Sequence, residues 1–172
     1  MTISTISETM QYLTFKLRDE VFALDISTVR EVLDFTTVTR MPETPDYMVG
    51  VINLRGSVVP VVDMRIKFRM NGTESTLNTC IIIAEIELDE EMTVFGALVD
   101  SVEEVMELDP DQIDPPPRIG TRLKTKFIRG MGKKNNHFII ILDIAKVFSA
   151  DDLAIAEDMG EDIPSLQTAA MA

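Results

Sequence analysis

Two short apolar runs separated by a turn stand out in the middle of the chain. Residues 51–54 and 58–62 flank the dipeptide Arg55-Gly56 and are rich in β-branched side chains. This pattern predicts a β-hairpin of two buried strands. Asp63 follows the second run, and aspartate is a common helix N-cap. We therefore expect one or two helical turns over residues 64–68.

The same pattern returns 80 residues later in the chain. This offset aligns Gly50 with Gly130, Asp63 with Asp143, and Phe68 with Phe148. An upstream block also repeats, since VFALDISTVREV from residue 21 resembles VFGALVDSVEEV from residue 94, with Asp25 near Asp100 and Glu31 near Glu104. Similar blocks in the same order indicate two copies of one β-rich unit, over about residues 12–68 and 79–148.

The two copies differ at the hairpin turn. The second copy has Asn135-Asn136, and asparagine tolerates the positive φ of a tight turn. The first copy has Arg55, which local turn chemistry does not explain. Arg55 is therefore a candidate for a function, and the alternative is a solvated arginine on a turn.

The rest of the pattern predicts short strands and brief helices. Residues 13–17 and 21–24 read as strands, and Asp25 or Ser27 would cap a helix that runs through Val32. Residues 79–87 and 92–100 predict a long hairpin, and residues 45–50 predict one helical turn that ends at Gly50. Together these elements favour two small barrels over a parallel α/β sheet.

The two ends and the connections differ from this core pattern. We expect residues 1–10 to be a flexible arm. We expect residues 151–172 to form an acidic helix, over about 151–158, and a fraying tail. Residues 71–78 form a polar loop. Residues 109–117, DPDQIDPPP, form a stiff extended connector, because proline fixes φ and donates no hydrogen bond.

Composition narrows the function classes. The chain has 172 residues, of which 45% are hydrophobic, so it can bury a sizeable core. Its net charge of -13 argues against nucleic acid. Residues 70–117 contain no Lys or Arg, whereas residues 118–137 hold seven and no acid. A partner could recognise this segregated surface, and the alternative is two solvated faces that keep the protein soluble. We see no membrane span and no signal peptide, and therefore expect a cytoplasmic protein without direct membrane insertion.

The residues needed for common catalytic and metal sites are scarce. His137 is the single histidine and Cys80 the single cysteine, so a structural zinc site cannot be built. A Ser-His-Asp or Cys-His site would have to use His137, but this residue stands in a basic polar turn, and the sequence has no Gly-x-Ser-x-Gly elbow. Cys80 lies in an apolar run and is expected to be a buried small hydrophobe, and the alternative is a reactive thiol. We predict no catalytic residue, no metal and no cofactor. The alternative from another class is a carboxylate-dependent hydrolase, but sequence spacing cannot show an opposed acid pair.

The motifs VFALDISTVREV, GVINLRGSVVPVVDMRIKF and FGALVDSVEEVMEL resemble the CheW family of bacterial chemotaxis coupling proteins. The resemblance covers about residues 12–148, and the order NLRG-x-VVPV-x-D is specific. It implies a mainly β fold of two five-stranded, SH3-like barrels with a shared apolar core, and no catalysis. It also implies two partners, the cytoplasmic tip of chemoreceptors and the regulatory domain of the histidine kinase CheA, which the family links into arrays.

The resemblance also implies a receptor-binding surface. Carried over by position, that surface includes Val29 and Glu31 on the predicted helix, Gly50, and Arg55 of NLRG. Arg55 would donate hydrogen bonds to a helical hairpin, Val29 would add apolar contact, and Glu31 would add a charge. A helix stop or a close backbone approach explains Gly50 equally well. An Arg55 sequestered in an internal ion pair would contradict this interpretation.

Two departures from the family pattern affect the choice of partner. The hairpin tip around residues 88–92 is longer and more acidic than expected, and the acidic tail is not a family feature. The second interpretation is therefore the same fold in a non-chemotactic kinase pathway, such as surface motility or development. We expect no fused receiver domain. No short motif fixes the kinase-contact residues.

Overall fold

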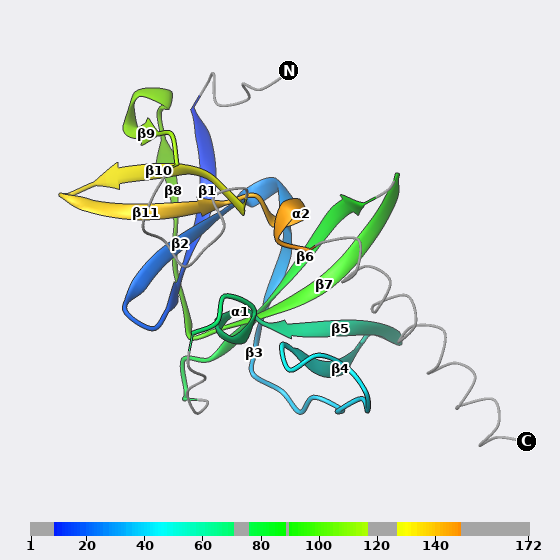
Figure 1. Cartoon of the computed structure of the whole chain (residues 1–172). Coiled ribbons are helices and arrows are strands. Elements are labelled where there is room, and N and C mark those ends of the chain that lie inside the picture. Colours follow the sequence, from blue (N-terminus) through cyan, green and yellow to red (C-terminus); the bar gives the residue numbers. More distant parts are fainter. Residues whose placement is uncertain (1–8, 71–75, 89, 117–126, 149–172) are drawn as a thin grey trace, which may run out of the picture.

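Two β-sheets make up most of the computed structural model, which describes residues 9–70, 76–88, 90–116 and 127–148 (Figure 1). One sheet has the strand order β3-β6-β7-β5-β4, and we call it the middle barrel because its strands come from the middle of the chain. The other has the order β8-β1-β2-β11-β10-β9, and we call it the terminal barrel. The predicted mainly β fold is confirmed.

The strands and short helices have the following bounds. The middle barrel contains β3 (Val29–Asp34), β4 (Met48–Leu54), β5 (Ser57–Asp63), β6 (Cys80–Leu88) and β7 (Glu91–Val99). The terminal barrel contains β1 (Met10–Leu17), β2 (Glu20–Asp25), β8 (Ser101–Leu108), β9 (Ile113–Asp114), β10 (Ile128–Lys134) and β11 (His137–Leu142). The helices of the described residues are η1 (Ile26–Thr28), α1 (Met64–Lys67), η2 (Pro110–Gln112) and α2 (Ile144–Val147).

The two barrels share one strand order. The order β3-β6-β7-β5-β4 corresponds to β8-β1-β2-β11-β10, and each contains one parallel pair, β5 with β7 and β11 with β2. A register shift also falls just before Gly50 in β4 and just before Gly130 in β10. The strands that correspond in the two sheets are therefore the strands that the sequence repeat aligns.

Each barrel takes strands from both halves of the chain. Residues 12–68 give their first hairpin, β1–β2, to the terminal barrel and β3, β4 and β5 to the middle barrel, and residues 79–148 do the reverse. Neither predicted repeat unit is therefore one barrel. The register pairs Val61 with Gly96 and Ile141 with Ala23. Ile141 is the repeat of Val61, so Ala23 corresponds to Gly96. Two residues further along each strand, Asp25 corresponds to Leu98, and not to Asp100 as expected.

Stacked aromatic rings join the two barrels in their shared core. Phe22 of β2 stacks on Phe68, which follows α1, with 6.0 Å between ring centroids. The equivalent pair is Phe95 of β7 and Phe148, at 4.3 Å. In each pair one ring lies on a strand of one barrel, and the other follows the short helix that comes after a strand of the other barrel, α1 after β5 and α2 after β11. The predicted shared apolar core is confirmed, with the four rings almost fully buried.

A buried charge network joins α1, the end of β5 and Asp100, which lies between β7 of the middle barrel and β8 of the terminal barrel. The Arg65 side chain, 3% exposed, donates to Asp63 Oδ2 from Nη2 at 2.9 Å and to Asp100 Oδ1 from Nη1 at 2.8 Å. Asp63 also caps α1 by accepting the Arg65 backbone N–H at 2.9 Å, as predicted. A buried guanidinium is tolerated only when its donors are satisfied, and here two carboxylates satisfy it.

Two predicted helical segments are wrong. Asp25 caps only the 3₁₀ turn η1, after which Val29 begins β3 and pairs with Ala84 of β6. The β-branched residues of this segment therefore satisfy their backbone in a sheet, not in a helix through Val32. The helical turn expected over residues 45–50 is instead one hydrogen-bonded turn, in which the Met48 N–H donates to the Pro45 carbonyl at 2.9 Å. β4 then begins at Met48, so Gly50 lies inside a strand.

Other expectations fall at the edge of the described residues or beyond it. The predicted arm over residues 1–10 is shorter, because Met10 already belongs to β1 and pairs with Leu108. The predicted connector over 109–117 is not uniformly extended, because it contains η2 and β9. Four further segments lie outside the described residues: residues 1–8 of the arm, residues 71–75 of the polar loop, residues 118–126 of the basic segment, and the acidic helix and tail.

Candidate functional site

The β4–β5 turn holds Arg55 in a backbone conformation that arginine rarely adopts. Its φ is 51°, and Asn135 in the equivalent β10–β11 turn has the same value. Positive φ suits asparagine and glycine and costs another residue about 1–2 kcal/mol. Asn53 Oδ1 accepts the Gly56 N–H at 2.8 Å and secures the turn. Arg18 and Arg69 also have positive φ, so the backbone conformation alone does not distinguish Arg55. What distinguishes it is the contact that its side chain makes.

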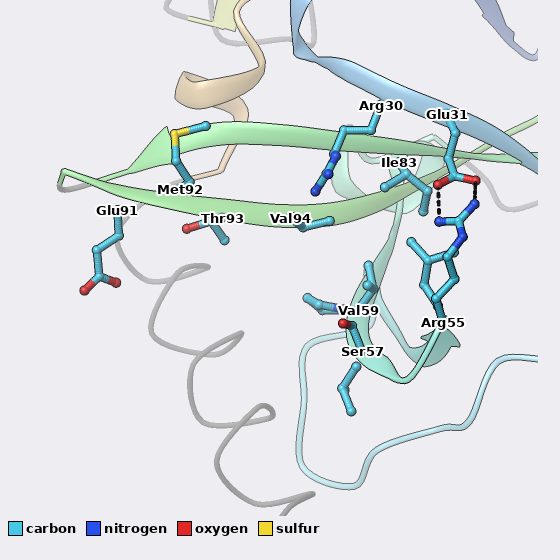
Figure 2. Close-up of a pocket in the computed structure, with 13 residues that line it drawn as sticks. Arg30, Glu31, Arg55, Ser57, Val59, Ile83, Glu91, Met92, Thr93 and Val94 are labelled. Carbon is cyan, nitrogen blue, oxygen red and sulfur yellow. Dashed lines mark hydrogen bonds and ion pairs between the residues drawn. The ribbon is translucent and has the colours of Figure 1, made fainter.

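The Arg55 side chain forms a bidentate ion pair with Glu31 of β3 (Figure 2). Nη1 donates to Oε2 at 2.7 Å, and Nη2 donates to Oε1 at 2.9 Å. The hydrogen bonds from Arg55 lower the pKa of Glu31, and the same contact raises the pKa of Arg55. The sequence analysis did not predict this pair, although it singled out both residues.

The ion pair does not sequester Arg55. Its side chain is 72% exposed, whereas that of Glu31 is 27% exposed. A guanidinium has five N–H donors, and Glu31 takes two of them. Within the described residues, three donors of Arg55 remain without an acceptor. The pair therefore orients the guanidinium and leaves it able to bind a further acceptor.

An open groove of about 480 Å³ lies beside this pair. Its walls come from β3, from β4 and β5 with their turn, and from β6 and β7 (Figure 2). Apolar lining residues are Leu54, Val58, Val59, Pro60, Ile83, Met92 and Val94. Two of them are well exposed, Val58 at 36% and Met92 at 60%. The groove thus combines apolar surface with a charged rim, as protein-binding surfaces do.

The sequence analysis did not identify Val58 and Met92 as candidates. Periodicity placed Val58 in a buried strand, because the pattern alone cannot show that the start of β5 is uncovered. The only signal for Met92 was the long hairpin tip around residues 88–92. β7 indeed begins at Glu91, and its first residues line the groove.

Val29 and Gly50 do not line the groove. Val29 lies on a strand, not on a helix, and packs against the shared core. Gly50 has a φ of 154°, and a Cβ there would lie 2.0 Å from the Thr39 carbonyl oxygen. A close backbone approach, not a helix stop, therefore explains this glycine. The structure brings Glu31 and Arg55 together and places the other two residues in supporting positions.

The described residues offer little for other chemistry. They contain no group of three or more side chains that could hold a metal ion. No helix among them is long and apolar enough to cross a membrane. Cys80 is half-buried, not fully buried as expected, and its Sγ contacts the Asn78 carbonyl oxygen at 3.0 Å. Burial raises the pKa of its thiol, which lowers the thiolate fraction and hence its reactivity.

Comparison with known proteins agrees with this fold. A family model described as a CheW-like domain matches residues 11–152. The chain is 34% identical to the chemotaxis protein CheW of Klebsiella aerogenes, over 88% of this chain and 89% of that protein. It is 33% identical to a probable chemotaxis protein CheW of Rhizobium etli, over 81% and 87%.

A solved structure extends the agreement to three dimensions. The crystal structure of the scaffolding protein TtCheW from Thermoanaerobacter tengcongensis matches with a TM-score of 0.73 and 34% identity. The match covers 83% of this chain and 94% of that one. The chain therefore belongs to the CheW family, whose members are chemotaxis scaffolds that catalyse no reaction.

Proposed function

We propose that this protein couples chemoreceptors to the histidine kinase CheA in signalling arrays, by binding both and catalysing nothing. In this proposal the protein is cytoplasmic and is recruited to membrane receptors through their cytoplasmic tips. The observation that carries the receptor contact is Arg55. It is held in a costly turn conformation, is 72% exposed, and keeps three donors without an acceptor among the described residues.

The proposed receptor-binding residues are Arg55, Glu31, Val29 and Gly50, in two kinds of role. Arg55 contacts the receptor tip directly, because a planar guanidinium can donate several hydrogen bonds to carboxylates or carbonyls. Glu31 orients the guanidinium. Val29 and Gly50 support the receptor-binding surface indirectly. Val29 packs on the shared core, and Gly50 lets β4 approach the backbone of Thr39.

The duplicated barrel supports an adaptor role. An adaptor needs separate faces for its partners, and two similar barrels present related surfaces in different positions. In the proposal the Arg55 face meets the receptor, and CheA binds elsewhere on exposed barrel edges. Binding of one partner then leaves the other surface open, which is what coupling requires.

A three-way pull-down tests the proposal. Purified protein is mixed with CheA, with a receptor signalling fragment, and with both together. We expect it to bind each partner alone and to increase the amount of CheA that sediments with the receptor fragment. Failure to bind either partner would contradict the chemotactic role and favour a different kinase pathway for the same scaffold.

A further inference from the structure

The two parallel strands of the middle barrel separate over half of their length. β5 and β7 pair at only three positions: Val61 with Gly96, Val62 with Ala97, and Asp63 with Leu98. Residues 57–60 of β5 and 91–95 of β7 precede this paired part. Figure 1 shows the two strands diverging toward their N-terminal ends. The 480 Å³ groove lies between these diverging segments, which supply eight of its lining residues.

Pro60 gives a physical reason for the separation. In the terminal barrel the equivalent pairing extends one position further toward the N-terminal ends of the strands, to Ile140 with Phe22. The 80-residue repeat makes Ile140 the counterpart of Pro60. Parallel pairing at this position requires the N–H of residue 60 to reach the carbonyl of Val94. Proline has no N–H, so it ends the ladder.

Backbone groups of both diverging segments point into the groove. Leu54 and Ser57 close the β4–β5 hairpin as a hydrogen-bonded pair, so by alternation the N–H and C=O of Val58 face away from β4. Leu88 and Glu91 close the β6–β7 hairpin in the same way, so those of Met92 and Val94 face away from β6. No described residue forms a hydrogen bond with these backbone groups.

We propose that this groove is a slot for one extended segment of a partner protein, which pairs with β5 and β7 as an added strand. Only an extended backbone can serve both rows of free groups, because a helix uses its own N–H and C=O groups internally. The assignment goes beyond receptor and kinase coupling, although both proposals use Arg55. The slot is named here the β5–β7 slot.

The chemistry of the slot specifies its occupant. An added strand antiparallel to β5 and β7 forms the stronger ladder, and its C-terminal end then lies at the mouth, beside Ser57 and Arg55. Three N–H donors of Arg55 have no acceptor there among the described residues. The Arg30 side chain is 56% exposed, and the Glu85 carboxylate oxygen with which it pairs is 3.6 Å away. Apolar side chains line the interior. The occupant is therefore a strand with alternating apolar residues and a carboxylate at its C-terminal end.

Amide hydrogen exchange with a defined peptide tests this assignment. The probe is acetyl-Thr-Val-Thr-Val-Asp with a free C-terminal carboxylate, and the control probe is the same peptide with N-methylated backbone amides. We expect the free protein to exchange the Val58, Met92 and Val94 amides quickly and the peptide to slow them about tenfold. The amides of Val59 and Thr93, which face the neighbouring strands β4 and β6, should not respond.

Substitutions at the slot separate it from general surface binding. Pro60→Ile restores the residue type of the terminal barrel, extends the ladder and should weaken peptide binding about tenfold. Pro115→Ile makes the same change on the exposed connector and should leave binding within about twofold. If Pro60→Ile fails to fold, Met92→Pro removes one slot N–H at the end of the hairpin and should also weaken binding.

Several outcomes would overturn the assignment. Equal binding of the N-methylated peptide would mean that strand pairing is not involved. Amides at Val58, Met92 and Val94 that are protected in the free protein at every concentration would mean that the slot is already closed. Protection that grows with protein concentration would identify a second copy as the occupant, and not a partner strand.

Discussion

Glu31 accepts hydrogen bonds from both terminal nitrogens of Arg55, so a strand of the middle barrel fixes the direction of an exposed side chain on a neighbouring turn. A free arginine on a turn samples many rotamers, and ordering it on binding costs free energy. The ion pair meets part of that cost before the partner arrives. It also explains why an exposed pair that adds little to stability can matter for recognition.

Removal of the guanidinium should weaken receptor binding and spare the fold. Arg55→Ala and Arg55→Glu are expected to reduce the affinity for a receptor signalling fragment by about 1–3 kcal/mol, because a charge-assisted contact at an interface is lost. Arg55→Asn supplies the residue of the equivalent turn, so any loss with this variant belongs to the side chain and not to the backbone. Affinity is measured by co-sedimentation, and folding by circular dichroism.

Lys134→Ala is the matched control for this experiment. Lys134 is an exposed cation beside the equivalent turn of the terminal barrel. Its removal should leave receptor binding unchanged. Arg55 variants that sediment with the receptor fragment as well as the wild type would remove Arg55 from the receptor surface.

The ionisation of Glu31 should depend on Arg55. Hydrogen bonds from Arg55 lower the pKa of Glu31 in the folded protein. A carboxylate with a lowered folded pKa stabilises the fold fully above its unfolded pKa, and this contribution is lost as the pH falls through the folded pKa. The pair should thus persist at mildly acidic pH, where ordinary glutamates begin to protonate.

An NMR titration of the Glu31 side-chain carboxyl carbon measures this effect. Arg55→Ala should raise the titration midpoint of Glu31, and Lys134→Ala should leave it in place. A midpoint that does not move in Arg55→Ala would show that the two side chains are not paired in solution.

The sequence predicted the parts of the fold that local chemistry decides. Asp63 and Asp143 cap short helices as expected, because a carboxylate that accepts a nearby backbone N–H needs no distant partner. The turns at Arg55 and Asn135 both have positive φ, as the comparison of the two copies implied. Of the predicted receptor-binding residues, Arg55 and Glu31 come together, but their ion pair could not be predicted, because they lie 24 residues apart in the chain.

The errors arose where tertiary pairing decides the structure. Val29 and Val32 fit one face of a helix by spacing, yet β6 offers them a strand partner, and pairing outweighs a weak local preference. The exchange of hairpins between the two barrels could not be predicted either. Both copies have the same local pattern whichever barrel their strands join, so only the three-dimensional contacts distinguish the arrangements.

Gly50 and Gly56 form a matched pair for testing backbone constraints. Gly50→Ala should lower the free energy of unfolding by about 2–4 kcal/mol, because its Cβ would lie 2.0 Å from the Thr39 carbonyl oxygen at a φ of 154°. Gly56→Ala should cost only about 1–2 kcal/mol, because its φ is 86° but nothing lies within 4 Å. Urea denaturation measures both.

Receptor binding of folded Gly50→Ala then separates its two possible roles. A supporting role predicts that the loss of binding follows the loss of folded protein. Weak receptor binding by a fully stable Gly50→Ala would instead place Gly50 in direct contact with the receptor.

Two buried hydroxyl groups on β1 should respond to removal in opposite ways. Thr14 is 1% exposed, because both faces of β1 are covered at this position. Its Oγ1 donates to the Glu104 carbonyl at 2.9 Å and accepts the Glu104 N–H at 3.1 Å, at a register shift between β1 and β8. The hydroxyl thus satisfies backbone groups that the ladder leaves free.

Tyr12 is 0% exposed, and its hydroxyl has no hydrogen-bond partner among the described residues. Tyr12→Phe removes an unsatisfied polar atom, so the free energy of unfolding should stay equal or rise by up to about 1 kcal/mol. Thr14→Val leaves the N–H and the carbonyl of Glu104 without their hydrogen-bond partner, and should lower the free energy of unfolding by about 1–3 kcal/mol. Urea denaturation compares the two variants at similar volume change. A Tyr12→Phe variant as unstable as Thr14→Val would mean that the tyrosine hydroxyl binds an internal water or a residue outside the described ones.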